Sequence, residues 1–177
     1  KISENGLTRE DRENLAFAAD VIRRGGTVCF PTETVYGLGA NALDADASAS
    51  IFTAKGRPQD NPLIIHLDSP DKANVYCEAN ENPYFEKVRS FMPGPITTIL
   101  QKRACIPDVV TAHLPSVGVR VPSHPVAHAF LAACGVPVAA PSANLSGRPS
   151  PTCARHVIDD LYGKVDVILA SGESSVG

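Results

Sequence analysis

The 177-residue sequence lacks several features that would place it in a broad functional class. No apolar run approaches the ~20 residues that a membrane-spanning helix needs. Basic residues are not in excess, since 16 Lys and Arg stand against 19 Asp and Glu. A protein whose main task is to grip a nucleic-acid backbone usually carries a basic excess, so the composition disfavours that class.

The usual signatures of covalent catalysis and of metal binding are also missing. The sequence has no Walker loop, no GxSxG, no HExxH and no Cys/His nucleophile pattern. Its five cysteines include no CxxC pair, which speaks against a zinc knuckle. Such cysteines fit a reducing compartment, so we expect a cytoplasmic protein, or an organellar form whose transit peptide was removed.

One pair of histidines has the spacing of metal ligands. His124 and His128 are four residues apart and could share a metal on one helix face. No third ligand stands nearby, however, and Pro125 suits the first position of a helix. The favoured interpretation is therefore a helix that begins after Ser123 or His124, and we expect no metal held by protein ligands.

Helical patterns alternate with short apolar segments along the chain. Thr8 with Asp11 indicates a helix start, and Asp44 can cap a second helix. Strands are expected at residues 27–30, 35–42, 63–67, 96–101, 117–121, 138–140 and 165–170, and further helices at 83–91, 125–134 and 152–161. Because no helix is evident between the fourth and fifth strands, we expect a mixed parallel and antiparallel sheet flanked by helices.

Two positive charges stand one residue apart at Lys55 and Arg57. The surrounding segment 55–62 is rich in Gly and Pro, and it links a predicted helix to a predicted strand, where α/β proteins build sites. Asn61 adds an amide donor. The alternative is a pair of solvated surface charges, the commonest fate of such residues. The pattern favours an exposed phosphate-binding loop.

A second polar segment follows the predicted strand 138–140. It contains Ser142, Asn144, Ser146 and Ser150, and the carboxyl end of a strand is the usual ligand edge of an open α/β sheet. The same residue types also satisfy turns, and the pattern leaves the two interpretations open. Thr152 is expected to cap the next helix. Cations on one loop and neutral donors on another suit a nucleoside triphosphate.

Three further positions have both a structural and a functional interpretation. Arg120 lies in an apolar strand, where a cation needs a partner, and its guanidinium suits a carboxylate; a solvent-facing position is the alternative. His66 lies in a predicted strand, where a core histidine is the default and a ligand contact the minority option. Residues 37–42 match GxGxxA, but their extended context favours a close backbone approach.

Five collinear stretches resemble the Sua5/YrdC/YwlC family of threonylcarbamoyl-AMP synthases. They are residues 31–38, 55–58 with 61–63, 93–97, 118–122 and 140–147. The resemblance runs from about Leu7 onward and implies a twisted mixed α/β sheet with a large concave cavity. Met92 departs from the Trp that the family often has there. Family members also continue past Gly177, so we expect residues 1–177 to form one domain that lacks its C-terminal end.

The resemblance implies a reaction and a set of site residues. The reaction would condense L-threonine, bicarbonate or CO2 and ATP with Mg²⁺ into L-threonylcarbamoyladenylate, releasing pyrophosphate without a prosthetic group. The product would pass to threonylcarbamoyl transferase machinery that forms N6-threonylcarbamoyladenosine in tRNA, with tRNA itself as a further contact and no membrane partner. The residues implied for threonine are Thr34, His66, Arg120 and Ala140. Those implied for ATP are Lys55, Arg57, Asn61, Ser116, Ser142, Asn144 and Ser150, with Lys55 and Arg57 as the catalytic pair.

This chemistry accounts for the missing nucleophile. A carbamate oxygen attacks the α-phosphorus, which needs positioning and neutralised charge rather than a covalent intermediate. Two alternatives remain. A carbamoyl-adenylate-forming domain of the hydrogenase-maturation type would normally accompany zinc fingers, which the cysteine pattern does not support. A non-catalytic RNA-binding module is disfavoured by the pI of about 5.9.

Overall fold

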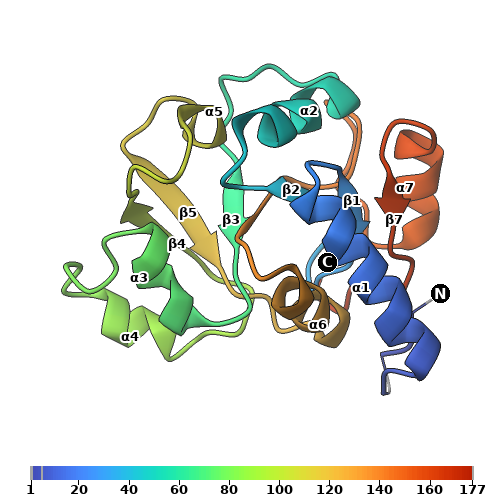
Figure 1. Ribbon diagram of the computed structural model, residues 1–177, viewed down its shortest axis with the longest axis horizontal. Coiled ribbons are helices and arrows are strands. Elements are labelled where there is room, and N and C mark those ends of the chain that lie inside the picture. The colour runs from blue at the N-terminus through green and yellow to red at the C-terminus, as the bar shows by residue number, and fades with distance from the viewer. Residues whose placement is uncertain (1, 5, 177) are drawn as a thin grey trace.

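A seven-stranded mixed sheet runs through the computed structural model, which describes residues 2–4 and 6–176 (Figure 1). The strand order is β4-β5-β3-β6-β2-β1-β7. The pairs β3–β5 and β1–β7 are parallel and the other neighbours are antiparallel, which confirms the predicted mixed sheet. The strands are β1 Val28–Phe30, β2 Gly37–Asn41, β3 Ile64–His66, β4 Thr97–Gln101, β5 Ser116–Arg120, β6 Val138–Ala140 and β7 Val167–Ile168.

The longer helices begin where local capping signals predict. Thr8 and Asp11 form a reciprocal capping box before α1, Asp44 caps α2, and His124 caps α6 with Pro125 at its first position. The helices are α1 Arg9–Arg23, α2 Ala45–Lys55, α3 Ala73–Tyr76, α4 Phe85–Arg89, α5 Asp108–Thr111, α6 Pro125–Cys134 and α7 Ala154–Leu161, with a 3-10 turn η1 at Pro70–Lys72. Every helix in the described ranges is too short or too polar to cross a membrane.

Two local predictions were wrong. The connection between β4 and β5 contains α5, which is a single turn and therefore too short to leave a periodic apolar pattern. Thr152 does not cap α7, because Cys153 occupies the N-cap position and makes no side-chain cap hydrogen bond. The carbonyl of Thr152 instead accepts the amide N–H of Ser174 at 2.8 Å, so this residue serves a contact between distant segments.

Helices cover one face of the sheet unevenly. Alternate residues of a strand point to opposite faces. On one face, α1 and α6 pack side by side against Phe30 and Val138 in one apolar cluster, away from β4 and β5 (Figure 1). On β4, Thr97 and Ile99 point to this face and are exposed, Ile99 to 63%. Leu100 points to the opposite face and is buried. The β4 end of that face is therefore accessible to solvent, while the opposite face carries the larger core cluster.

Candidate active site

Lys55 joins the two polar segments that the sequence singles out. It is the last residue of α2, which ends in the left-handed Gly56 at φ 60°. The Lys55 ammonium donates to the carbonyl of Asn144 at 2.5 Å and also to the carbonyl of Ser142. In return, the amide N–H of Ser146 donates to the carbonyl of Lys55 at 3.0 Å. The basic segment and the 142–146 loop are thus bonded directly to each other.

The burial of Lys55 corrects one expectation. The sequence predicts Lys55 on an exposed loop, whereas the residue is only 2% exposed, because α2 extends to it and the 142–146 loop closes over it. Burial, and secondly the nearby charge of Arg57, lower the pKa of Lys55 to about 8. An ammonium group has three N–H donors. Two of them hold the loop, so one is left for an anion.

Polar atoms on both loops lack a partner within the described residues. Arg57 donates through Nη2 to the carbonyl of Asn61 at 3.4 Å, but its buried Nε has no such contact. The Asn144 amide donates to the carbonyls of Leu145 and Arg148 at 2.8 Å each, while its buried Oδ1 accepts nothing. Buried polar atoms normally have a hydrogen-bond partner. Arg57 Nε and Asn144 Oδ1 are therefore candidate contacts for a bound ligand.

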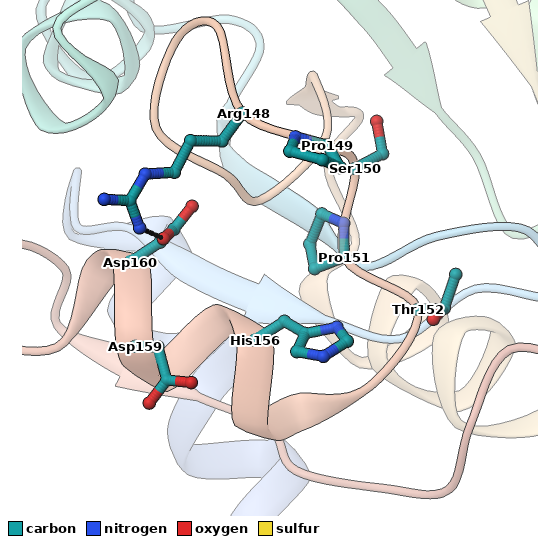
Figure 2. A pocket seen from close by; sticks show the side chains of 8 residues that line it. All are labelled: Arg148, Pro149, Ser150, Pro151, Thr152, His156, Asp159 and Asp160. Atoms are coloured by element: carbon teal, nitrogen blue, oxygen red, sulfur yellow. Dashed lines mark hydrogen bonds and ion pairs between the residues drawn. The ribbon is translucent and has the colours of Figure 1, made fainter.

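A cavity of about 330 Å³ adjoins the 142–146 loop. It is lined by Arg148, Pro149, Ser150, Pro151, Thr152, His156, Asp159 and Asp160 (Figure 2). Ser150 is exposed at this cavity, and it is the member of the predicted ATP set that lies farthest along the chain. Ser150 follows the Lys55-bound loop by four residues, so this member of the predicted ATP set lies near that loop.

Asp160 ties this loop to α7, and sequence reasoning missed it. Its carboxylate accepts the amide N–H of Leu145 at 3.0 Å and the guanidinium of Arg148 at 2.6 Å. Burial alone would raise the pKa of Asp160, but these donors lower it below its usual value. Figure 2 shows Asp160 directed at Arg148 and Asp159 directed away. No local pattern separates the two neighbouring aspartates, so only the fold identifies the one that matters.

A second polar cluster gathers around Arg120. Its Nη2 donates to Glu33 Oε1 at 2.7 Å and to Thr34 Oγ1 at 2.9 Å. His66 lies opposite Arg120 in the parallel β3–β5 register. The structure thus brings together Thr34, His66 and Arg120, and adds Glu33, which the prediction omitted. The available signal was the need of an arginine in an apolar strand for an acidic partner.

The His66 ring is both a core residue and a member of this cluster. It is 5% exposed and meets Phe30 edge-on at 5.7 Å between ring centroids. Its Nδ1–H donates to the carbonyl of Ile64 at 3.2 Å. Burial, followed by the charge of Arg120, lowers the pKa of His66 to about 4. The imidazole is therefore neutral at physiological pH and adds no charge to the site.

Strand β5 carries a predicted ATP residue at one end and the arginine of the Arg120 cluster at the other. Ser116 begins β5 and Arg120 ends it, and four residues at about 3.3 Å each amount to roughly 13 Å. Midway between them, Gly118 pairs with Ile64, which in turn pairs with Ala140. Ala140 lies two residues before Ser142, so the 142–146 loop extends from one end of these strands, while His66 and Arg120 lie toward the other end and Ala140 lies between them.

The remaining motifs have structural roles. His124 Nδ1 accepts the amide N–H of Val126 at 3.2 Å as the α6 cap, and no cluster of three metal-binding side chains occurs in the part of the chain that the structure describes. In the GxGxxA match, a Cβ on Gly39 would lie 2.6 Å from Val138 Cγ1. The extended conformation that the sequence favours is confirmed by β2, and the atoms that exclude a side chain at Gly39 belong to the side chains of Val138 and Phe30.

The chain is similar to proteins of known family. It is 47% identical over 173 residues to the threonylcarbamoyl-AMP synthase of Pyrococcus abyssi, covering 98% of this chain and 51% of that protein. It is also 47% identical to the Bacillus subtilis protein of the same name, covering 92% and 47%. The crystal structure of P. abyssi Sua5 complexed with L-threonine superimposes with a TM-score of 0.92 at 47% identity, over 99% of this chain and 51% of that one.

This chain spans about half the length of those relatives. A family model described as "Telomere recombination" matches residues 20–177, nearly all of the sequence. The chain therefore belongs to the Sua5/YciO/YrdC family.

Proposed function

We propose that this chain forms L-threonylcarbamoyladenylate from L-threonine, bicarbonate or CO2 and ATP, with release of pyrophosphate. The observation that carries the proposal is the direct bonding of Lys55 to the 142–146 loop, at one end of strands whose other end holds the Arg120 cluster. One strand length separates a place for phosphates from a place for an amino acid. Similarity to the two synthases supports the same reaction.

The phosphate end is assigned to the Lys55 loop pair. Arg57 and the free N–H of Lys55 neutralise the triphosphate, while hydroxyl and amide groups orient it. These neutral groups are Asn61, Ser116, Ser142, Asn144 and Ser150. Charge-assisted contacts of this kind stabilise developing charge on a phosphoryl group without a protein nucleophile. Mg²⁺ enters with the triphosphate as part of the substrate complex.

The amino-acid end is assigned to Thr34, His66, Arg120 and the backbone of Ala140. Arg120 receives the carboxylate and the polar groups beside it orient the substrate. The α-ammonium loses a proton to solvent, and the neutral amine then adds to CO2 with loss of a second proton to give a carbamate. The carbamate oxygen attacks the α-phosphorus as pyrophosphate leaves in line. The protein's contribution to this step is to hold both reactants over the same strands and to balance their charges.

The product suits a downstream step that transfers the threonylcarbamoyl group to tRNA, and we place the protein in the cytoplasm on that basis. The relatives at 47% identity are threonylcarbamoyl-AMP synthases, which favours threonine over a carbamoyl-adenylate reaction. The RNA-binding alternative draws no support from the net charge of −3.

The test is pyrophosphate release by the full-length protein from ATP and bicarbonate, with each amino acid in turn. We expect release with threonine, weaker release with serine and the strongest discrimination against valine. A site that hydrogen-bonds a hydroxyl rejects an analogue lacking it more strongly than one lacking a methyl group. Equal release with valine, or release without any amino acid, would refute the proposal.

A further inference from the structure

Glu33 and Arg120 form a buried ion pair in which each partner keeps one unpaired atom. Their side chains are 6% and 12% exposed. Arg120 Nη2 meets Glu33 Oε1 at 2.7 Å. Glu33 Oε2 and Arg120 Nε, by contrast, are buried and have no hydrogen-bond partner within the described residues. Because buried polar atoms are nearly always paired, a free acceptor beside a free donor indicates a ligand that supplies both kinds of group.

We propose that Glu33 receives the α-ammonium group of the amino-acid substrate while Arg120 receives its carboxylate. This inference rests on the proposed function, because it concerns the same threonine site. An α-amino acid carries its two opposite charges on one carbon, which matches an acceptor and a donor held side by side. Glu33 Oε2 accepts from the ammonium, and Arg120 Nε donates to the carboxylate.

Charge balance favours such a zwitterion over a simple anion. The Arg120–Glu33 pair is neutral as a unit, so a carboxylate alone would leave an uncompensated buried negative charge, which is strongly unfavourable. His66 is neutral, since its pKa is about 4. Burial also lowers the pKa of His124, the other histidine that senses the charge of Glu33. The ammonium of the substrate is therefore the group that restores neutrality.

The backbone around Glu33 is anchored, so its carboxylate has a defined place. The carbonyl of Glu33 accepts the amide N–H of Val176 at 2.8 Å. The Ser174 hydroxyl donates to the carbonyl of Thr32 at 3.0 Å. On the other side of Glu33, the Thr34 hydroxyl is held by Arg120. A carboxylate held in this way can discriminate between substrates by charge.

The test compares two ligands on the full-length protein by calorimetry. They are L-threonine and 2,3-dihydroxybutanoate of the same configuration, in which a hydroxyl replaces the α-ammonium. We expect Glu33→Gln to reduce the preference for threonine by about 10- to 100-fold, the usual effect of one hydrogen bond between charged groups. The matched control is Glu81→Gln, which removes a more exposed carboxylate paired with Arg103 at 3.2 Å, and it should leave the preference unchanged.

Three outcomes decide the matter. A selective loss of threonine binding in Glu33→Gln supports the inference. Equal weakening of both ligands overturns it, because Glu33 would then only orient Arg120. Failure of the unsubstituted protein to bind threonine overturns the proposed function, and the inference with it.

A second measurement avoids a variant that leaves Arg120 without its counter-charge. The unsubstituted protein is labelled with ¹³C at glutamate carboxyl groups, and the Glu33 signal is assigned by its loss in Glu33→Asp. We expect that signal to move when threonine is added and to stay in place with the dihydroxy analogue. The same displacement with both ligands would overturn the inference.

Discussion

ATP binding should weaken as the pH rises through about 8, because Lys55 then loses its proton. Burial and the charge of Arg57 lower the pKa of Lys55 from 10.5 to about 8 in the folded protein. Only the ammonium form can bond two carbonyls and still attract a phosphate. Below pH 8 this form dominates, and above it the ammonium fraction falls about tenfold per pH unit. At pH 9 the affinity should therefore be lower by about tenfold.

The assay is direct titration of a nonhydrolysable ATP analogue in the absence of threonine, from pH 6.5 to 9.5. Omitting threonine removes the titration of its amine, and the triphosphate is fully ionised above about pH 7. Two variants identify the group responsible. Lys55→Met should bind weakly with no inflection near pH 8. Arg57→Ala should move the inflection to higher pH, because the like charge that depresses the pKa of Lys55 is gone.

Two results would refute this reasoning. One is constant affinity of the unsubstituted protein from pH 7 to 9.5, which would mean that the Lys55 ammonium does not contact phosphate. The other is an inflection that persists in Lys55→Met, which would assign the titration to another group.

Three further substitutions probe the site and its support. Arg57→Ala should reduce turnover about 10²- to 10³-fold. The Tm should stay unchanged, because within the described residues Arg57 makes one side-chain hydrogen bond, the 3.4 Å contact to Asn61. A large fall in Tm would show a structural role for Arg57 instead. Asp160→Ala should lower the free energy of unfolding by about 1–3 kcal/mol in urea titrations, because the Leu145 amide N–H and the Arg148 guanidinium lose their acceptor. The same substitution should raise KM for ATP. An unchanged KM would mean that the 142–146 loop does not need Asp160 as an anchor. Gly39→Ala should cost about 1–3 kcal/mol, because the new Cβ would lie 2.6 Å from the buried Val138 Cγ1. Full stability in the same titration would show that the neighbouring side chains shift easily.

Elements whose causes are local can be predicted from the amino-acid sequence. The capping box of Thr8 and Asp11, the Asp44 cap and the Pro125 helix start each involve groups within a few residues of one another. Short apolar runs between turn residues marked all seven strands, with boundaries that differ by at most two residues and agree at both ends for β6. These signals are readable because a helix end or a strand reports on its own neighbourhood.

The partners of the site residues, by contrast, depend on contacts between distant segments of the folded chain. The sequence singled out Lys55 and Arg120, but it placed Lys55 on an exposed loop and left Arg120 without a partner. Lys55 bonds carbonyls that lie 87 and 89 residues farther along the chain, and Arg120 bonds Glu33 across 87 residues. Such contacts depend on the register of β3, β5 and β6 and on how a loop closes over the end of α2. Strand register and loop closure leave no periodic pattern in the sequence. Every residue has a backbone carbonyl, so the sequence does not show which carbonyls Lys55 will bond, and the residues around Glu33 do not show which strand its carboxylate will contact.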